Sequence, residues 1–251
     1  MSAPEGINWE WATRTGGTLN ARDKMKLVAP LVRAVGSFGG ERVRMALGRR
    51  GHGRLDLDSV RWPDSQLARD AESEAREVLT PHVLQHSYRT YLFGLVLAGL
   101  DGVAIDEEIA FVSSLLHDLH LEHPTLGRCF AVVGGERAEH FSLSHGVEPK
   151  RAAVIGAAVA GHLTPGATED LSDPAGFVAA GALTDVTGAR LQQTDPQWVA
   201  DLINRYPRLE FKRHMRACLA IESEQVPNGR IRLLRRYAAF PLLIRTAPFP
   251  E

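Results

Sequence analysis

Residues 109–119 read IAFVSSLLHDL, an apolar stretch that ends in an adjacent histidine and aspartate, His117 and Asp118. The preceding residues 101–108, DGVAIDEE, form a turn followed by acidic side chains. Acidic side chains are favourable in the first turn of a helix, because the positive end of the helix dipole lies there. We therefore predict a buried helix that ends at the His-Asp pair. Burying two unpaired polar groups would cost free energy, and a metal ion that bonds to both would offset that cost.

Helical patterns continue on both sides of this stretch. Asp64 or Ser65 fits an N-cap, and Thr80 followed by Pro81 fits an N-cap with proline at the first helical position. Alternating β-type patterns are scarce, so we predict an all-α fold. The expected helices span residues 22–35, 65–79, 81–100, 109–119, 134–145, 149–162, 173–191, 196–205 and 209–225.

The chain divides into three predicted parts: an N-terminal arm and linker at 1–60, packed on or flanking the core, a helical metal-binding domain at 61–225, and a C-terminal extension at 226–251. Within the arm, residues 36–56, GSFGGERVRMALGRRGHGRLD, are rich in glycine and basic side chains. We interpret them as a loop or flexible linker. The tail at 240–251, FPLLIRTAPFPE, contains three prolines, which predicts an extended or mobile segment.

Composition limits the classes of partner. A formal net charge of −1 gives no general reason to expect nucleic acid or an acidic membrane. Cys129 and Cys218 are the only cysteines and form no CxxC pair, which fits a reducing cytosol. The longest apolar stretch, 91–100, is shorter than the ~20 residues that span a bilayer. We expect a soluble cytoplasmic protein with a small-molecule substrate and without nucleic-acid or membrane partners. Assembly into a homo-oligomer is also possible.

Asp185 is the second notable carboxylate. Its neighbours one helical turn away on either side are all small: Gly181, Ala182, Gly188 and Ala189. Such a face allows close approach by another helix or by a ligand. Small residues alone would favour tight helix packing. Together with His117 and Asp118, they favour metal ligation by Asp185.

Three segments in order resemble the H…HD…D signature of the HD-domain metal-dependent hydrolase superfamily. They are HSYRTYLFG at 86–94, SLLHDL at 114–119 and ALTD at 182–185. Within that superfamily, the H-S-x-R start and AAVAGHLTPG at 157–166 are most similar to the cyanamide hydratase-like branch. The resemblance implies a compact helical bundle of the HD-domain type with N- and C-terminal extensions. It also implies one metal ion held by His86, His117, Asp118 and Asp185.

The resemblance further implies roles for the residues around the metal. The ion would be zinc, iron or manganese, with zinc slightly preferred. It would bind a water whose pKa falls toward ~7, and Asp118 would hold or accept the water's proton. His162 and Thr164 would donate to the substrate or to developing negative charge. Arg89 would bind an anionic part of the substrate or an acidic side chain. A second metal held through His140 and His162 is a less favoured alternative.

We therefore expect a metal-dependent hydrolase or hydratase acting on a small molecule, cyanamide-like or related. An HD-family phosphohydrolase acting on a nucleotide or phosphate ester is one alternative, and a non-catalytic metal-stabilised binding module is another. Many HD phosphohydrolases have a lysine shortly after the HD pair, where this chain has LHL at 119–121. Arg89, Arg128 or Lys150 could replace that lysine. A small closed cavity would favour a small neutral substrate, and a cleft lined by these cations would favour a phosphate ester.

Overall fold

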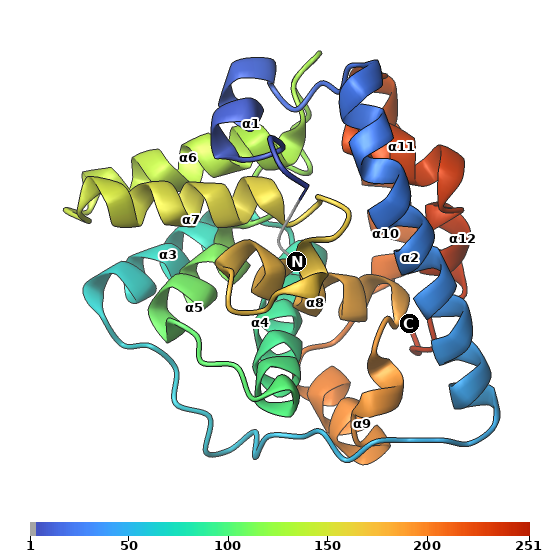
Figure 1. The fold of residues 1–251 in the computed structure, drawn as a ribbon. Helices are drawn as coiled ribbons and strands as arrows, with labels where there is room; N and C mark the ends of the chain where they lie inside the picture. The colour runs from blue at the N-terminus through green and yellow to red at the C-terminus, as the bar shows by residue number, and fades with distance from the viewer. Residues whose placement is uncertain (1–3) are drawn as a thin grey trace.

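The computed structural model describes residues 4–251 as a bundle of helices (Figure 1). Within that range there is no β-strand, and pairing of the β type is limited to two isolated bridges. The all-α prediction is confirmed. The α-helices are α1 Trp9–Thr15, α2 Ala21–Ala46, α3 Gln66–Val78, α4 Pro81–Asp101, α5 Glu107–Leu116, α6 Phe130–Ser144, α7 Pro149–Gly161, α8 Pro174–Thr187, α9 Pro196–Arg205, α10 Phe211–Gln225, α11 Arg230–Tyr237 and α12 Phe240–Arg245. Two short 3₁₀ helices, Ala167–Glu169 and Leu191–Gln193, flank α8.

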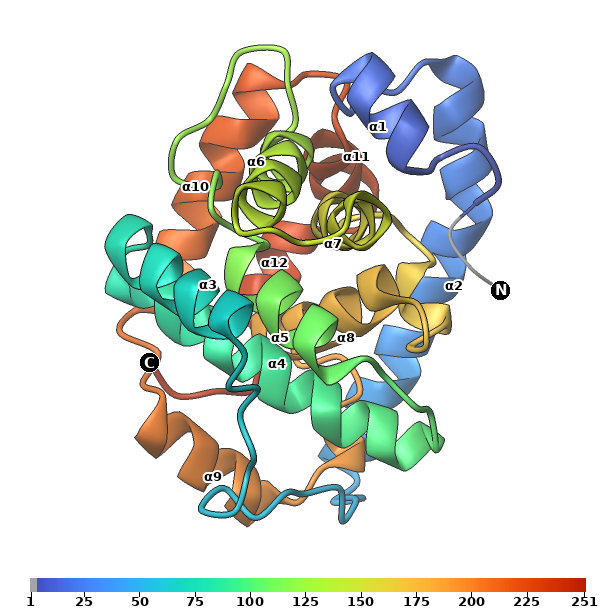
Figure 2. The same cartoon turned by 90° about the vertical axis from the view of Figure 1, so that its left-hand side faces the viewer.

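The centre of the bundle is the contact between α4 and α8, with α5 packed against both (Figure 2). The two central helices approach very closely at Gly181, where an added Cβ would lie 2.0 Å from the carbonyl oxygen of Thr90. Gly94 on α4 makes similar room for the ring of Phe177 on α8. The small residues around Asp185 therefore do permit close helix packing, and the helix that approaches is α4.

The buried faces follow from the sequence. Almost all of α4 between Val83 and Ala98 is buried, and α5 is buried from Ile109 onward. Helices that are apolar on all sides belong in the interior of a protein. Ser65 caps α3 by accepting a hydrogen bond from the backbone of Ala68, whereas Thr80 occupies the N-cap position before Pro81 without a side-chain capping bond. Among residues 4–251, no helix combines the length and hydrophobicity needed to cross a membrane.

Two predictions about irregular segments were wrong. The expected linker at 36–56 is helical as far as Ala46, because α2 continues without a break. The glycines in this segment lower its helix propensity, but two side chains later in α2 bind it to the end of α8 and the segment that follows. Glu41 accepts a hydrogen bond from the backbone of Arg190, and Arg42 donates to the carbonyl oxygen of Thr187.

The C-terminal tail is the second correction, because residues 240–245 form α12 instead of an extended or mobile segment. Pro241 occupies the first turn of this helix, where no backbone donor is required. Phe240 and Ile244 are buried one turn apart and fix α12 to the core. The helix ends before the prolines at 248 and 250, which cannot donate backbone hydrogen bonds.

Candidate metal centre

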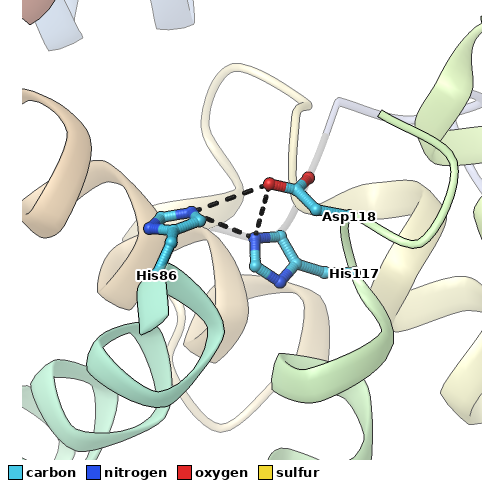
Figure 3. Close-up of side chains that lie close together, drawn as sticks. All are labelled: His86, His117 and Asp118. Carbon is cyan, nitrogen blue, oxygen red and sulfur yellow. Dashed lines mark hydrogen bonds and ion pairs between the residues drawn. The ribbon is translucent and has the colours of Figure 1, made fainter. Parts of the chain in front are cut away.

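Three of the predicted ligands converge at one point in the interior. His86 comes from α4, and His117 and Asp118 follow directly after the last residue of α5 (Figure 3). The Nε2 atoms of His86 and His117 lie 3.2 Å apart. Oδ2 of Asp118 lies 3.7 Å from Nε2 of His86 and 3.3 Å from Nε2 of His117. All three residues are buried, since none exposes more than 3% of its surface.

The orientation of both imidazoles is set by hydrogen bonds on their opposite nitrogens. Nδ1 of His86 donates to Oδ2 of Asp185 at 2.7 Å, and Nδ1 of His117 donates to the carbonyl oxygen of Ser114 at 2.8 Å. Carboxylate and carbonyl oxygens only accept, so the ring protons are placed on Nδ1. In neutral rings, two Nε2 lone pairs then point toward each other and toward a carboxylate. A cation between them satisfies all three groups, and fixing histidine ligands through Nδ1 is common in metal sites.

The separations fit one small cation. Zinc bonds to nitrogen and oxygen at about 2.0–2.2 Å, so neighbouring ligands in a tetrahedral site lie about 3.3–3.6 Å apart. The three observed separations, 3.2, 3.3 and 3.7 Å, are close to that range. Imidazole nitrogen and carboxylate oxygen suit zinc, iron or manganese. The residues present therefore fit the predicted divalent metal.

Burial and neighbouring charges both shift the pKa values of the three residues in this group. Burial alone would raise the pKa of Asp118, but His117, His86 and His162 outweigh burial and lower that pKa to about 2. Burial lowers the pKa of His86 despite the nearby carboxylate of Asp185. Burial also opposes protonation of His117, but the adjacent Asp118 outweighs it and raises the pKa of His117. A carboxylate that remains ionised in the interior provides the charge that a cation needs.

Asp185, the fourth predicted ligand, lies behind His86 and outside the group of three. Its Oδ1 accepts from Arg89 at 2.8 Å and from Arg208 at 2.7 Å, and its Oδ2 accepts from His86 and from Arg89 at 2.9 Å. Burial would raise the pKa of Asp185, but the two guanidinium groups lower it well below its usual range. With both oxygens hydrogen-bonded in this way, Asp185 fixes the orientation of the His86 ring and lies outside the three-residue group of potential ligands.

Arg89 and Arg208 are fully buried around the same carboxylate. Arg89 also donates to the carbonyl oxygens of Tyr206 and Pro207, so its guanidinium has protein partners on several sides. Of the two roles predicted for Arg89, the structure therefore contains the acidic side-chain partner. Arg208 completes the same network and was not predicted.

His162 and Thr164 both line the cavity beside the three ligands. Nδ1 of His162 donates to the carbonyl oxygen of Val159 at 2.6 Å, which leaves Nε2 as an acceptor 3.9 Å from Oδ1 of Asp118. Burial lowers the pKa of His162 to about 3. Thr164 accepts a hydrogen bond from Arg230 at 2.9 Å, which leaves its hydroxyl proton free to donate. The arrangement therefore suits Thr164 as the donor and His162 as an acceptor.

The cavity next to the ligands has a volume of about 140 Å³ and is mainly apolar. It lies between α8 on one side and α2, α10, α11 and α12 on the other. No lysine or arginine of residues 4–251 lines it. Its apolar wall includes Leu31, Val35, Leu183, Val186, Met215 and Leu219.

The other predicted residues lie elsewhere. His140 is exposed on α6 and belongs to no potential ligand group within residues 4–251, so the arrangement does not bring it together with His162. Arg128 pairs with Glu136 at 2.6 Å, and Lys150 is exposed at the start of α7. The cations that could have replaced the missing phosphate-binding lysine are therefore absent from the described cavity wall.

No protein-family model matches this chain, and no curated protein matches it significantly.

Proposed function

We propose that this chain is a metal-dependent hydrolase or hydratase that acts on a small, uncharged and largely apolar molecule. The observation that carries the proposal is the apolar cavity that reaches His86, His117 and Asp118 without any lysine or arginine in its described lining. An apolar cavity of ~150 Å³ accommodates a benzene-sized molecule. The volume of about 140 Å³ is therefore suited to a substrate of that size.

The resemblance of the H…HD…D series to the HD-domain superfamily supports the same proposal. His86, His117 and Asp118 would hold one divalent transition metal, and Asp185 would keep His86 in position. When bound, such an ion supplies Lewis-acid chemistry and lowers the pKa of a coordinated water toward ~7. The buried negative charge of Asp118 and the two Nε2 lone pairs favour a cation at that point over a neutral group.

The chain's own residues can then manage the proton and the substrate. Nε2 of His162 and Oδ1 of Asp118 face the same space and can accept a hydrogen bond or a proton from attacking water. The hydroxyl group of Thr164 can donate to a substrate atom that gains negative charge. The wall around these groups is mainly apolar, so a substrate that fills the cavity would displace water from them and strengthen these electrostatic interactions.

This lining argues against a phosphate ester as substrate. A transferring phosphoryl group carries charge that enzymes stabilise with metal ions and with arginine or lysine. The buried guanidinium of Arg89 is already engaged by Asp185 and two backbone carbonyls. A neutral nitrile, amide or ester carries no such charge and needs no arginine or lysine in the cavity wall.

A substrate screen tests the proposal directly. The protein loaded in turn with Zn²⁺, Fe²⁺ or Mn²⁺ would be assayed with small neutral nitriles, amides and esters, and separately with nucleotides and phosphate esters. We expect turnover in the neutral panel that is lost in Asp118→Ala and kept in the exposed control His140→Ala. Phosphate release without turnover of the neutral panel would contradict the proposed substrate class. Failure of both panels with metal still bound would favour the non-catalytic binding module.

A further inference from the structure

A second group of potential metal ligands lies outside the centre described above. Glu122 is in the turn that follows α5, four residues after Asp118, and His214 and Cys218 lie one helical turn apart on α10. Glu122 and the side chain of His214 expose 12% and 25% of their surface, and Cys218 is also partly buried. The group is thus sheltered yet reachable from solvent, and contains three different ligand types.

The ligand atoms of this group already face one another. Nε2 of His214 lies 2.7 Å from Oε1 of Glu122 and 3.6 Å from Sγ of Cys218. Zinc bonds to sulfur at about 2.3 Å and to nitrogen at about 2.0–2.1 Å, which places the two atoms about 3.6 Å apart in a tetrahedral site. The sulfur–nitrogen separation therefore already fits. The carboxylate and the imidazole would move apart by about half an ångström, because a cation replaces the proton between them.

Neighbouring contacts hold two of these side chains in place. Glu122 accepts hydrogen bonds from the hydroxyl and the backbone amide of Thr80 at the start of α4, at 2.8 and 3.2 Å. The ring of His82 stacks on His214 with a centroid separation of 4.3 Å and an interplanar angle of 13°. Nδ1 of His82 is directed to the carbonyl oxygen of Leu209 at 2.5 Å. His82 therefore supports the face of His214 while the Nε2 edge of His214 remains directed at Glu122 and Cys218.

We propose that Glu122, His214 and Cys218 form a second metal site, selective for a zinc-like ion and distinct from the His86, His117 and Asp118 centre. Thiolate, imidazole and carboxylate together are ligands that zinc accepts, whereas magnesium and calcium prefer oxygen alone. Solvent would provide the fourth ligand, because all three side chains are only partly buried. Such an ion would link the end of α5 to α10 and, through Glu122, to the start of α4.

The thiol makes this site distinguishable by spectroscopy, since the first centre contains no cysteine. The full-length metal-free protein would be titrated with Co²⁺ under reducing conditions and observed in the near ultraviolet, where thiolate-to-cobalt charge transfer absorbs. We expect the band to saturate by about two equivalents of cobalt in the wild-type protein, because the first centre also binds the ion, and to disappear when Zn²⁺ is added. We also expect the band in the double variant His86→Ala/His117→Ala, because that variant leaves the second group untouched.

Substitutions of the two cysteines show which thiol produces the charge-transfer band. Cys218→Ser should remove it, and the matched control Cys129→Ser should keep it. Absence of the band from the wild-type protein, or its persistence in Cys218→Ser, would overturn the proposal. If Cys218→Ser fails to fold by circular dichroism, protection from alkylation replaces it. Zn²⁺ should slow the reaction of Cys218 with iodoacetamide in the wild type but not in His214→Ala, and equal rates with and without Zn²⁺ in the wild type would overturn the proposal.

Discussion

The Nε2 atoms of His86 and His117 lie 3.2 Å apart in the interior, while each ring uses its Nδ1 to donate to an oxygen acceptor. The two lone pairs are thereby directed at a common point beside Oδ2 of Asp118. A divalent cation at that point would satisfy all three groups, which supports the proposed metal centre.

Replacing Asp185 with asparagine tests whether this residue is a ligand or a support. In the Cys218→Ser background, which removes the thiol of the second proposed site, we expect Asp185→Asn to retain metal binding with an affinity about 10–100-fold lower, the usual effect of losing a group that orients a ligand. The change should also destabilise the metal-free protein by about 3–5 kcal/mol, since it leaves buried Arg89 without its charge partner and Arg208 with Glu251 alone. Calorimetric metal titration and urea unfolding measure the two effects.

The exposed Asp201→Asn is the matched control for that change and should alter neither quantity. Complete loss of metal binding in a folded Asp185→Asn protein would show instead that Asp185 is a direct ligand, as the sequence predicts.

Acid sensitivity should depend on His162. Its pKa is lowered by burial from its ordinary value of 6.5 to about 3 in the folded chain. Below pH 6.5 the unfolded chain therefore binds a proton that the folded chain does not, so stability falls as pH falls toward 3. For the metal-free protein, we expect this residue to contribute a loss of about 2 kcal/mol between pH 7 and pH 5. Urea unfolding at both pH values should show a correspondingly smaller loss in His162→Leu. Equal losses in the two proteins would contradict the assignment.

The close approach of α4 and α8 predicts a difference between two glycine substitutions. Gly181→Ala should destabilise the protein by about 1–3 kcal/mol or more, because the new methyl group would meet the carbonyl oxygen of Thr90 and force the helices apart. Gly36→Ala, on the exposed part of α2 where nothing lies within 4 Å, should stabilise it by up to ~1 kcal/mol. Thermal and urea unfolding of both variants provide the comparison, and similar effects would argue against the helix contact.

Cys218 should react slowly in the metal-free protein. Burial, with Glu122 and Asp118 nearby, raises the pKa of its thiol from an ordinary 9.0 to about 11. The reactive thiolate is then about 100-fold scarcer at pH 8 than for an unperturbed thiol. Alkylation of the Cys129→Ser variant by iodoacetamide should therefore be slow at pH 8 and accelerate about tenfold per unit up to pH 10. A rate that levels off near pH 9 would contradict the raised pKa.

The sequence was most informative where local rules decide structure. Proline after Thr80 and the acidic start of α5 predict their helices, since caps and dipole effects act within one turn. The small residues around Asp185 indicated close approach by a helix or by a ligand, and Gly181 makes such a helix contact with α4. The continuation of α2 past Gly36 could not be predicted in this way, because its support comes from residues 187 and 190, far away in the chain.

The candidate site was also predicted only in part. The order H…HD…D in the sequence correctly indicated which residues lie near one another, but it cannot distinguish a carboxylate that binds a metal from one that orients a histidine. That distinction depends on Arg208, which comes from the loop between α9 and α10 and occupies Oδ1 of Asp185. An arginine in a polar loop is usually exposed at the surface, so no sequence pattern indicated that Arg208 is buried.

The central claim is that His86, His117 and Asp118 hold one divalent metal, and metal titration of two matched proteins tests it most directly. The Cys218→Ser background removes the thiol ligand of the second site, so calorimetric titration with Zn²⁺ reports on the first centre. We expect about one equivalent of Zn²⁺ to bind to Cys218→Ser and none at comparable affinity to bind to Cys218→Ser/His117→Ala, with both proteins folded by circular dichroism. Equal zinc binding by the two folded proteins, or none by the first, would contradict the claim.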